Sequence, residues 1–167
     1  SEAIARFADD PLKEKILPKI CEGTQLSGIA FSETRHGLDL SSISTRAIFT
    51  GDAIVINGQK THVADRGPHG GYLVLCRTGT KEEPAATALS MVWVEGDKQG
   101  VCLTDAGPKF STNMVKSADV TFENVTLPAS NLVGEAGCGL GQLEAFFNEI
   151  KLLTAAQALG IAQGALE

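Results

Sequence analysis

The sequence predicts a mainly β protein with helical segments at both ends. From about residue 27 to 128, short runs rich in Ile, Val, Thr and Phe are interrupted at close intervals by Gly, Asn and Asp, a pattern typical of strands separated by turns. Before and after this region, apolar residues recur at helical spacing instead. With 167 residues, 43% hydrophobic and 20% charged, the chain has the composition of a globular domain rather than a disordered segment.

The first 22 residues predict a helical lead-in. Asp9, Asp10 and Pro11 favour a helix start, because an aspartate can cap the first free N–H groups and proline is tolerated in the first turn. The apolar positions that follow this helical spacing are Ile4, Phe7, Leu12, Ile16 and Ile20.

The middle region predicts a series of strands. Asn57-Gly58 readily adopts the positive φ angles of a type I′ turn, so a hairpin is expected from strands 53–56 and 59–63. A turn at 50–52 would lead into it from a strand at 45–49. The other expected strands are 72–77, 89–95, 101–105 and 118–122.

The last part of the chain predicts one long helix over 140–167. Ala156, Gly160 and Gly164 recur every four residues on one side of it, and each interior glycine costs about 1 kcal/mol relative to alanine. A close-packed neighbour would offset that cost. We therefore expect further helices to pack here and the chain to be the middle of a longer subunit.

Charge and cysteine spacing exclude several classes. The net charge is −6, the 14 basic residues are scattered and only 5% of residues are aromatic, which opposes nucleic-acid binding. Cys21, Cys76, Cys102 and Cys138 lie too far apart for a CxxC pair, which favours reduced thiols; the apolar neighbours of Cys76 and Cys102 predict that both are buried. No run of about 18 apolar residues predicts a membrane span, and a cytoplasmic location is expected.

Common catalytic and metal-binding motifs are also missing from the sequence. It contains no GxxxxGK[ST], HExxH or GxSxG, and its three histidines have no ligand companions at local spacing, so no metal site is predicted. Trp93, in an apolar run, is expected to pack in the core.

Several segments, taken in order, do carry a resemblance. They are 28–33 (GIAFSE), 37–39 (GLD), 56–60 (INGQK), 120–125 (VTFENV) and 155–167 (AAQALGIAQGALE). Their order and spacing resemble the acyl-CoA dehydrogenase family over nearly the whole chain. The resemblance implies the end of an N-terminal helical domain in 1–25, a middle β-barrel domain in 26–130, and the loop and first helix of a truncated C-terminal helical domain in 131–167.

The resemblance also implies an activity. In such flavoproteins, FAD lies between the middle domain and the C-terminal helices, a carboxylate removes the α-proton of an acyl-CoA and the β-hydrogen leaves as hydride, giving the trans-2-enoyl-CoA. Electrons then pass to an electron-transfer flavoprotein. A homo- or hetero-oligomer is implied, in the cytoplasm or, in a eukaryote, the mitochondrial matrix. The base is expected beyond residue 167, so the isolated 167 residues are expected to be inactive.

The cofactor-binding residues come from two segments that match the family. In the first, Ile29, Ala30, Phe31 and Ser32 would follow the flavin, and Leu38 stands where the family has a phosphate-contacting serine. In the second, His62, Val63 and Ala64 match a Trp-Ile-Thr triplet, so His62 replaces the ring-shielding tryptophan and Ala64 replaces a hydroxyl donor. Whether His62 still covers the flavin or only fills the tryptophan's place stays open.

The substrate-binding residues lie on the last helix. Asn148 and Lys151 match an Asp-x-x-Arg pattern that contacts the CoA part of the substrate, and Lys151 keeps the charge but not the fork of an arginine. A minority of the family carries its base at the position of Ile150. Glu149 lies about 100° round the helix from it, so a surface glutamate is expected there.

Two alternatives follow from the departures at Leu38, His62 and Ala64. The chain could belong to a catalytically degenerate family member that serves as a structural or partner subunit. It could also come from a flavin monooxygenase of the same fold.

Overall fold

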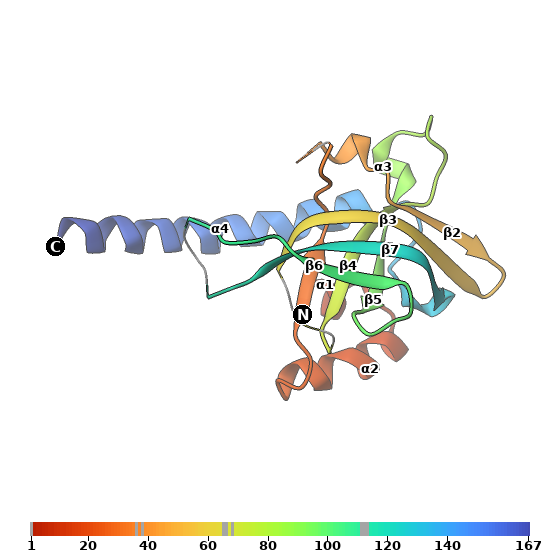
Figure 1. The fold of residues 1–167 in the computed structure, drawn as a ribbon, viewed down its shortest axis with the longest axis horizontal. Helices are drawn as coiled ribbons and strands as arrows, with labels where there is room; N and C mark the ends of the chain where they lie inside the picture. The colour runs from red at the N-terminus through yellow and green to blue at the C-terminus, as the bar shows by residue number, and fades with distance from the viewer. Residues whose placement is uncertain (1, 36, 38, 65–66, 68, 111–113) are drawn as a thin grey trace.

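The computed structural model describes residues 2–35, 37, 39–64, 67, 69–110 and 114–167, which form one sheet with helices around it (Figure 1). The strands are β1 (Ser27–Ala30), β2 (Arg46–Thr50), β3 (Ala53–Ala64), β4 (Gly71–Arg77), β5 (Leu89–Glu95), β6 (Val101–Asp105), β7 (Ser117–Pro128) and β8 (Leu132–Val133). The helices are α1 (Glu2–Phe7), α2 (Asp10–Cys21), α3 (Ala85–Ala88) and α4 (Gly139–Leu166), with short 3-10 helices η1 (Leu40–Ser42) and η2 (Ala129–Asn131).

The predicted mainly β fold is confirmed, but the sheet is open rather than a closed barrel. Its strands follow the order β6-β7-β3-β2-β4-β5-β8, and β1 pairs with β4 in parallel. Within the described residues, β6 and β8 at the two ends of this path do not pair with each other. Strands β6, β7, β3 and β2 form one part of the sheet, and β4, β5 and β8 form the other. The two parts are joined where β2 pairs with β4, at the described residue pair Arg46–Arg77. The sheet therefore curves around a core without closing on itself.

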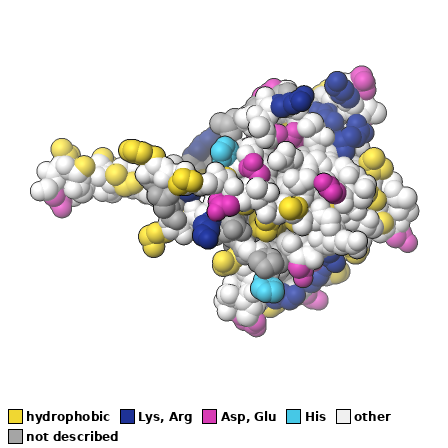
Figure 2. All heavy atoms as spheres, in the orientation of Figure 1, with side chains coloured by type: hydrophobic (Ala, Val, Ile, Leu, Met, Phe, Trp, Pro, Cys, Tyr) yellow, Lys and Arg dark blue, Asp and Glu magenta, His cyan; other side chains and the backbone are white. Residues whose placement is uncertain are grey.

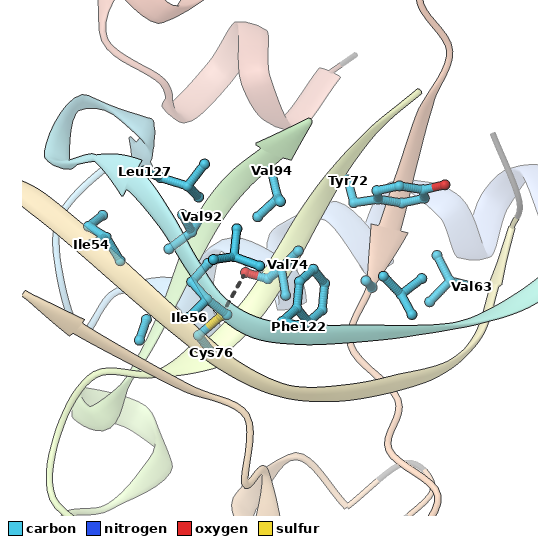
Figure 3. Close-up of a cluster of buried hydrophobic side chains, with 14 residues drawn as sticks. Ile54, Ile56, Val63, Tyr72, Val74, Cys76, Val92, Val94, Phe122 and Leu127 are labelled. Atoms are coloured by element: carbon cyan, nitrogen blue, oxygen red, sulfur yellow. Dashed lines mark hydrogen bonds between the residues drawn. The ribbon is translucent and has the colours of Figure 1, made fainter. Parts of the chain in front are cut away.

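The core has two parts, one on each face of β4 and β5. Tyr72, Val74 and Cys76 of β4 pack inside the curved sheet with Ile54, Phe122 and their neighbours (Figure 3). The alternate β4 residues, with Trp93 and Met91 of β5, pack on the other face against α1, α2 and α4. Because both faces are covered, β4 and β5 are almost continuously apolar.

The helix predicted near Pro11 is confirmed as α2. The Asp9 carboxylate accepts a hydrogen bond from the Leu12 N–H at 3.0 Å and caps the helix, with the proline in its first turn. Leu12 and Ile16 are buried against the outer face of β4 and β5. This contact fixes the helical lead-in on the sheet.

The hairpin predicted at Asn57-Gly58 is wrong. β3 continues through both residues, and its register against β7 shifts between Ile56 and Gly58. A Cβ at Gly58 would lie 2.6 Å from the Thr45 Cα, so only a glycine allows these two backbone segments to lie this close. The Asn57 amide in turn bonds Asn124 of β7. The turn expected at 50–52 does connect β2 to β3.

The prediction that Cys76 and Cys102 are both buried is right for the first and wrong for the second. Cys76 is fully buried in the core, as expected, whereas Cys102 is exposed. Cys102 lies on β6, an end strand of the sheet with β7 on one side only, and its alternating side chains turn Cys102 toward solvent.

The long helix predicted at the end of the chain is confirmed as α4. Its first turns are buried at Gly139, Gln142 and Leu143, and from residue 151 onward every side chain is exposed. Figure 1 shows this part extending away from the sheet, and Figure 2 shows hydrophobic side chains along it. Among the residues described, no helix has the length and apolarity needed to cross a membrane.

Candidate functional site

A cavity of about 330 Å³ lies on the helix-covered face of the sheet. Its walls come from β1 and the residue after it, the end of β3, the facing strands β4 and β5, and the helices α1 and α4. We call it the β1–β3 pocket. It brings together segments that are far apart in the sequence.

The pocket contains half of the residues predicted to bind a flavin. Ile29, Phe31, His62 and Ala64 line it. Ala30 and Val63 do not, because their side chains turn to the core inside the sheet, as alternation along a strand requires. Ser32 follows Phe31 without lining the pocket, and Leu38 lies outside the described residues.

His62 reaches the pocket through a β-bulge. Between the pairs Lys60–Val120 and Val63–Ala118, two residues of β3 face the single Asp119 of β7. His62 has φ of 55°, a left-handed conformation that is uncommon for residues other than glycine. The Asp119 carboxylate accepts from the Thr61 hydroxyl at 2.5 Å and from the His62 N–H at 3.3 Å. The bulge thus directs the exposed imidazole to the pocket wall.

A buried ion pair links the two segments that are predicted to bind the flavin, residues 29–32 and 62–64. The Lys60 ammonium, fully buried, lies 2.9 Å from a Glu33 carboxylate oxygen and donates to the Phe31 carbonyl at 3.1 Å. Next to it, the Thr61 N–H donates to the Ser32 carbonyl at 2.9 Å. Lys60 and Glu33 therefore hold the wall residue Phe31 against the strand that carries His62.

Hydrogen bonds complete the surroundings of Glu33. Its carboxylate accepts from the Ser44 N–H and hydroxyl and from the Thr45 N–H, at 2.6 to 2.9 Å. Burial works to raise the pKa of Glu33, but the charge of Lys60 and these bonds outweigh it and lower the pKa to about 2. The carboxylate is therefore ionised at neutral pH.

Burial shifts the pKa values of two neighbours as well. It lowers the pKa of Lys60, against the attraction of Glu33, and it raises the pKa of the Cys76 thiol to about 12. Cys76 is therefore a neutral thiol at physiological pH, and Glu33 is the acidic partner of Lys60.

Sequence reasoning missed the other walls of the pocket, which are Ala3, Ile4, Ser27, Gly28, Leu73, Trp93 and Phe146. Trp93 is core, as expected, but it also lines the pocket, and its indole N–H has no acceptor among the described residues. Phe147, next to Phe146 on α4, meets the edge of the Phe31 ring with the centroids 5.2 Å apart. No local pattern could place these side chains, because α1, β5 and α4 meet only in the folded chain.

The two predicted substrate residues lie together on α4, outside the pocket. The Lys151 ammonium donates to the Asn148 side-chain oxygen at 3.2 Å, and both residues are exposed. Lys151 also borders a shallow groove of about 390 Å³ along α4. Glu149 forms an exposed ion pair with Arg6 at 2.7 Å, as a surface glutamate would.

The walls of the β1–β3 pocket suit one face of a planar ring system. Its volume is at the small end of ligand cavities, most of its walls are apolar, and aromatic rings from Phe31 and His62 stand among them. The unpaired Trp93 N–H supplies one buried donor nearby. In the described part of the chain, no carboxylate lines the pocket and no group of three metal-ligating side chains occurs.

Known proteins provide an independent comparison. The family model described as "Acyl-CoA dehydrogenase, middle domain" matches residues 28–125. A cyclohex-1-ene-1-carbonyl-CoA dehydrogenase of Syntrophus aciditrophicus is 35% identical over 159 residues, which cover 93% of this chain and 37% of that protein. The chain thus spans about two fifths of the length of the curated relatives it matches.

Solved structures agree with this match. An acyl-CoA dehydrogenase from Geobacillus kaustophilus superposes with a TM-score of 0.81 at 33% identity, over 86% of this chain and 38% of the other. A structure described as the electron transferring flavoprotein of Acidaminococcus fermentans superposes with a TM-score of 0.91 at 29% identity, over 99% of this chain and 43% of the other.

Proposed function

The chain belongs to the acyl-CoA dehydrogenase family, and from this premise we propose that it supplies the flavin-facing part of an FAD-dependent enzyme that oxidises acyl-CoA to trans-2-enoyl-CoA. The observation that carries the proposal is the β1–β3 pocket, where two separate segments that resemble the family's flavin segments form one wall. FAD bound there would supply a hydride acceptor.

The chain's own residues would position and shield the reacting groups. Phe31 and His62 would lie against the ring system, and Ile29, Ala64 and Phe146 would exclude water from it. The main chain at Ala30, Ser32 and Val63 would complete the wall, held in place by the pair of Lys60 and Glu33.

The remaining parts of the proposal concern the substrate, the partners and the domains. Lys151, positioned by Asn148, would bind the CoA part of an acyl-CoA on the exposed side of α4. Residues 1–25, 26–130 and 131–167 would correspond to three successive parts of the subunit, with the base on a part outside these 167 residues. Electrons would leave to an electron-transfer flavoprotein, in a homo- or hetero-oligomeric enzyme of the cytoplasm or the mitochondrial matrix.

One observation favours a second candidate, a non-catalytic partner subunit. His62 and Ala64 replace a tryptophan and a threonine at positions that do line the pocket, so a shielding ring is smaller and a hydroxyl donor is absent. If these changes abolish flavin binding, the chain would serve a structural role in a mixed assembly.

The visible spectrum of the purified protein at its natural length separates the two candidates. We expect a flavin absorption band that bleaches when acyl-CoA is added without oxygen. Substitution of Phe31 by Ala should weaken flavin retention, whereas substitution of the exposed Phe49 by Ala, as a matched control, should not. A colourless protein that takes up no FAD on reconstitution would overturn the dehydrogenase and support the partner subunit.

A further inference from the structure

A second cavity, of about 510 Å³, lies where the loop containing η1 meets the adjoining ends of β2 and β4. Residues 41–44 form one side of it, and Arg46, Arg77 and Lys81 form the rest. Among the described residues, the lining thus includes three cationic side chains and no carboxylate. We call it the Arg46–Arg77 cavity.

Arg77 is a buried cation with no anionic partner in the part of the chain that the structure describes. It is only 6% exposed, and its guanidinium donates to four backbone carbonyls, those of Ser41, Ile43, Thr80 and Glu83, at 2.7 to 3.2 Å. No carboxylate in the described part of the chain forms an ion pair with it. A guanidinium has five N–H donors, so one of them lacks an acceptor among the described residues. Burial of an unpaired charge is costly, which favours an anion beside it.

The position of Arg46 increases this preference for an anion. Arg46 and Arg77 are direct partners on neighbouring strands, where like charges repel each other. Lys81 adds a third positive charge from the loop after β4. Figure 2 shows Lys and Arg side chains gathered at the upper right, over the part of the molecule where Figure 1 places α3 and β2.

Three carboxylates of the same region accept hydrogen bonds from the chain, and one of them, the Glu83 carboxylate, accepts from the Thr80 N–H. Glu33 accepts from Ser44 and Thr45 and pairs with Lys60. Asp39 accepts from the hydroxyls of Ser41 and Ser42. Within the described residues, none of these carboxylates forms an ion pair with Arg46, Arg77 or Lys81.

We propose that the Arg46–Arg77 cavity binds a phosphoryl group. Guanidinium groups match phosphate oxygens in geometry as well as charge, and the cavity is large enough for a phosphate that is part of a larger molecule. This site is separate from the β1–β3 pocket, because the two cavities share no lining residue. The phosphoryl group belongs either to free phosphate, which goes beyond the proposed function, or to the nucleotide part of CoA, in which case the site rests on the proposed function.

A titration of the purified protein with inorganic phosphate at constant ionic strength, followed by ³¹P NMR, tests the site. We expect saturable binding that weakens about fivefold or more in Arg46→Gln and in Lys81→Gln, since each change removes one charged donor. The matched control Lys98→Gln removes a half-buried lysine on the turn between β5 and β6, outside the cavity, and should leave binding unchanged. Arg77 is not substituted, because its loss would also leave four backbone carbonyls without their hydrogen-bond donor.

Thermal unfolding of the same variants separates binding from folding. Without phosphate at low salt, Arg46→Gln should unfold at the same or a higher temperature than the parent, because repulsion from Arg77 is relieved. With phosphate, the parent should gain more stability than Arg46→Gln. The proposal would be contradicted if Arg46→Gln were less stable than the parent without phosphate and phosphate stabilised both proteins equally.

Competition identifies the source of the phosphoryl group. Displacement of phosphate by CoA but not by dephospho-CoA supports a nucleotide 3′-phosphate, and displacement by neither supports free phosphate. No saturable phosphate binding, or equal weakening in Lys98→Gln, would overturn the site. No flavin is needed for these measurements, so their outcome is independent of the proposed dehydrogenase activity.

Discussion

At the scale of single residues, the Lys60–Glu33 pair is a buried ion pair whose loss should be costly. Lys60→Met leaves the Glu33 carboxylate buried beside Ser44 and Thr45 without its cation, and we expect a loss of about 3–5 kcal/mol in the free energy of unfolding. The double variant with Glu33→Gln should lose less, because no unpaired charge remains. Urea unfolding measures both.

Lys15→Met is the matched control for this change. Its ion pair with Glu95 has a lysine side chain that is 47% exposed, and such pairs contribute at most about 1 kcal/mol. If Lys60→Met costs no more than Lys15→Met, the buried pair does not fasten the two segments.

The pH dependence of stability follows from the same carboxylate. The folded pKa of Glu33 is about 2, below the ordinary value of 4.5, so its stabilising contribution is complete above pH 4.5 and is lost as the pH falls toward 2. The lowered pKa of Lys60 has the opposite sign, because its contribution to stability rises with pH up to the ordinary value of 10.5. The difference in urea midpoint between the parent and Glu33→Gln should therefore shrink over this acid range. A constant difference would contradict the assignment.

At the scale of elements, the bulge of β3 directs His62 to the pocket, and Asp119 of β7 holds it. Asp119→Ala removes the acceptor of two hydrogen bonds, so we expect a loss of about 1–3 kcal/mol and faster amide exchange at His62. Glu123→Ala, at an exposed position of the same strand, should change neither quantity. Unaltered exchange at His62 in Asp119→Ala would show that the strand geometry alone maintains the bulge.

At the scale of the whole molecule, the proposed function gives the 167 residues one wall of a flavin site. No described carboxylate lines the β1–β3 pocket, and α4 is exposed from residue 151 onward. We therefore expect no acyl-CoA oxidation by these 167 residues alone when FAD and an artificial electron acceptor are added. Turnover above the rate of a protein-free control would contradict this expectation.

The sequence by itself determined the elements whose signals are local. Helix α2 begins where Asp9 and Pro11 predict it, α4 follows the helical spacing of its apolar residues, and the strands β5 and β6 occupy the expected ranges. Each of these signals depends on neighbours within one or two turns or along one strand, and local sterics and burial pattern are enough to specify them.

Only the tertiary structure decided the features that depend on distant neighbours. Asn57-Gly58 is a good turn pair locally, yet the approach of Thr45 and the pairing with Asn124 keep β3 extended through it. The same is true of Trp93 in the pocket wall and of Arg46 beside Arg77. Strand register and close packing bring these residues together, and no periodicity within a single segment contains that information.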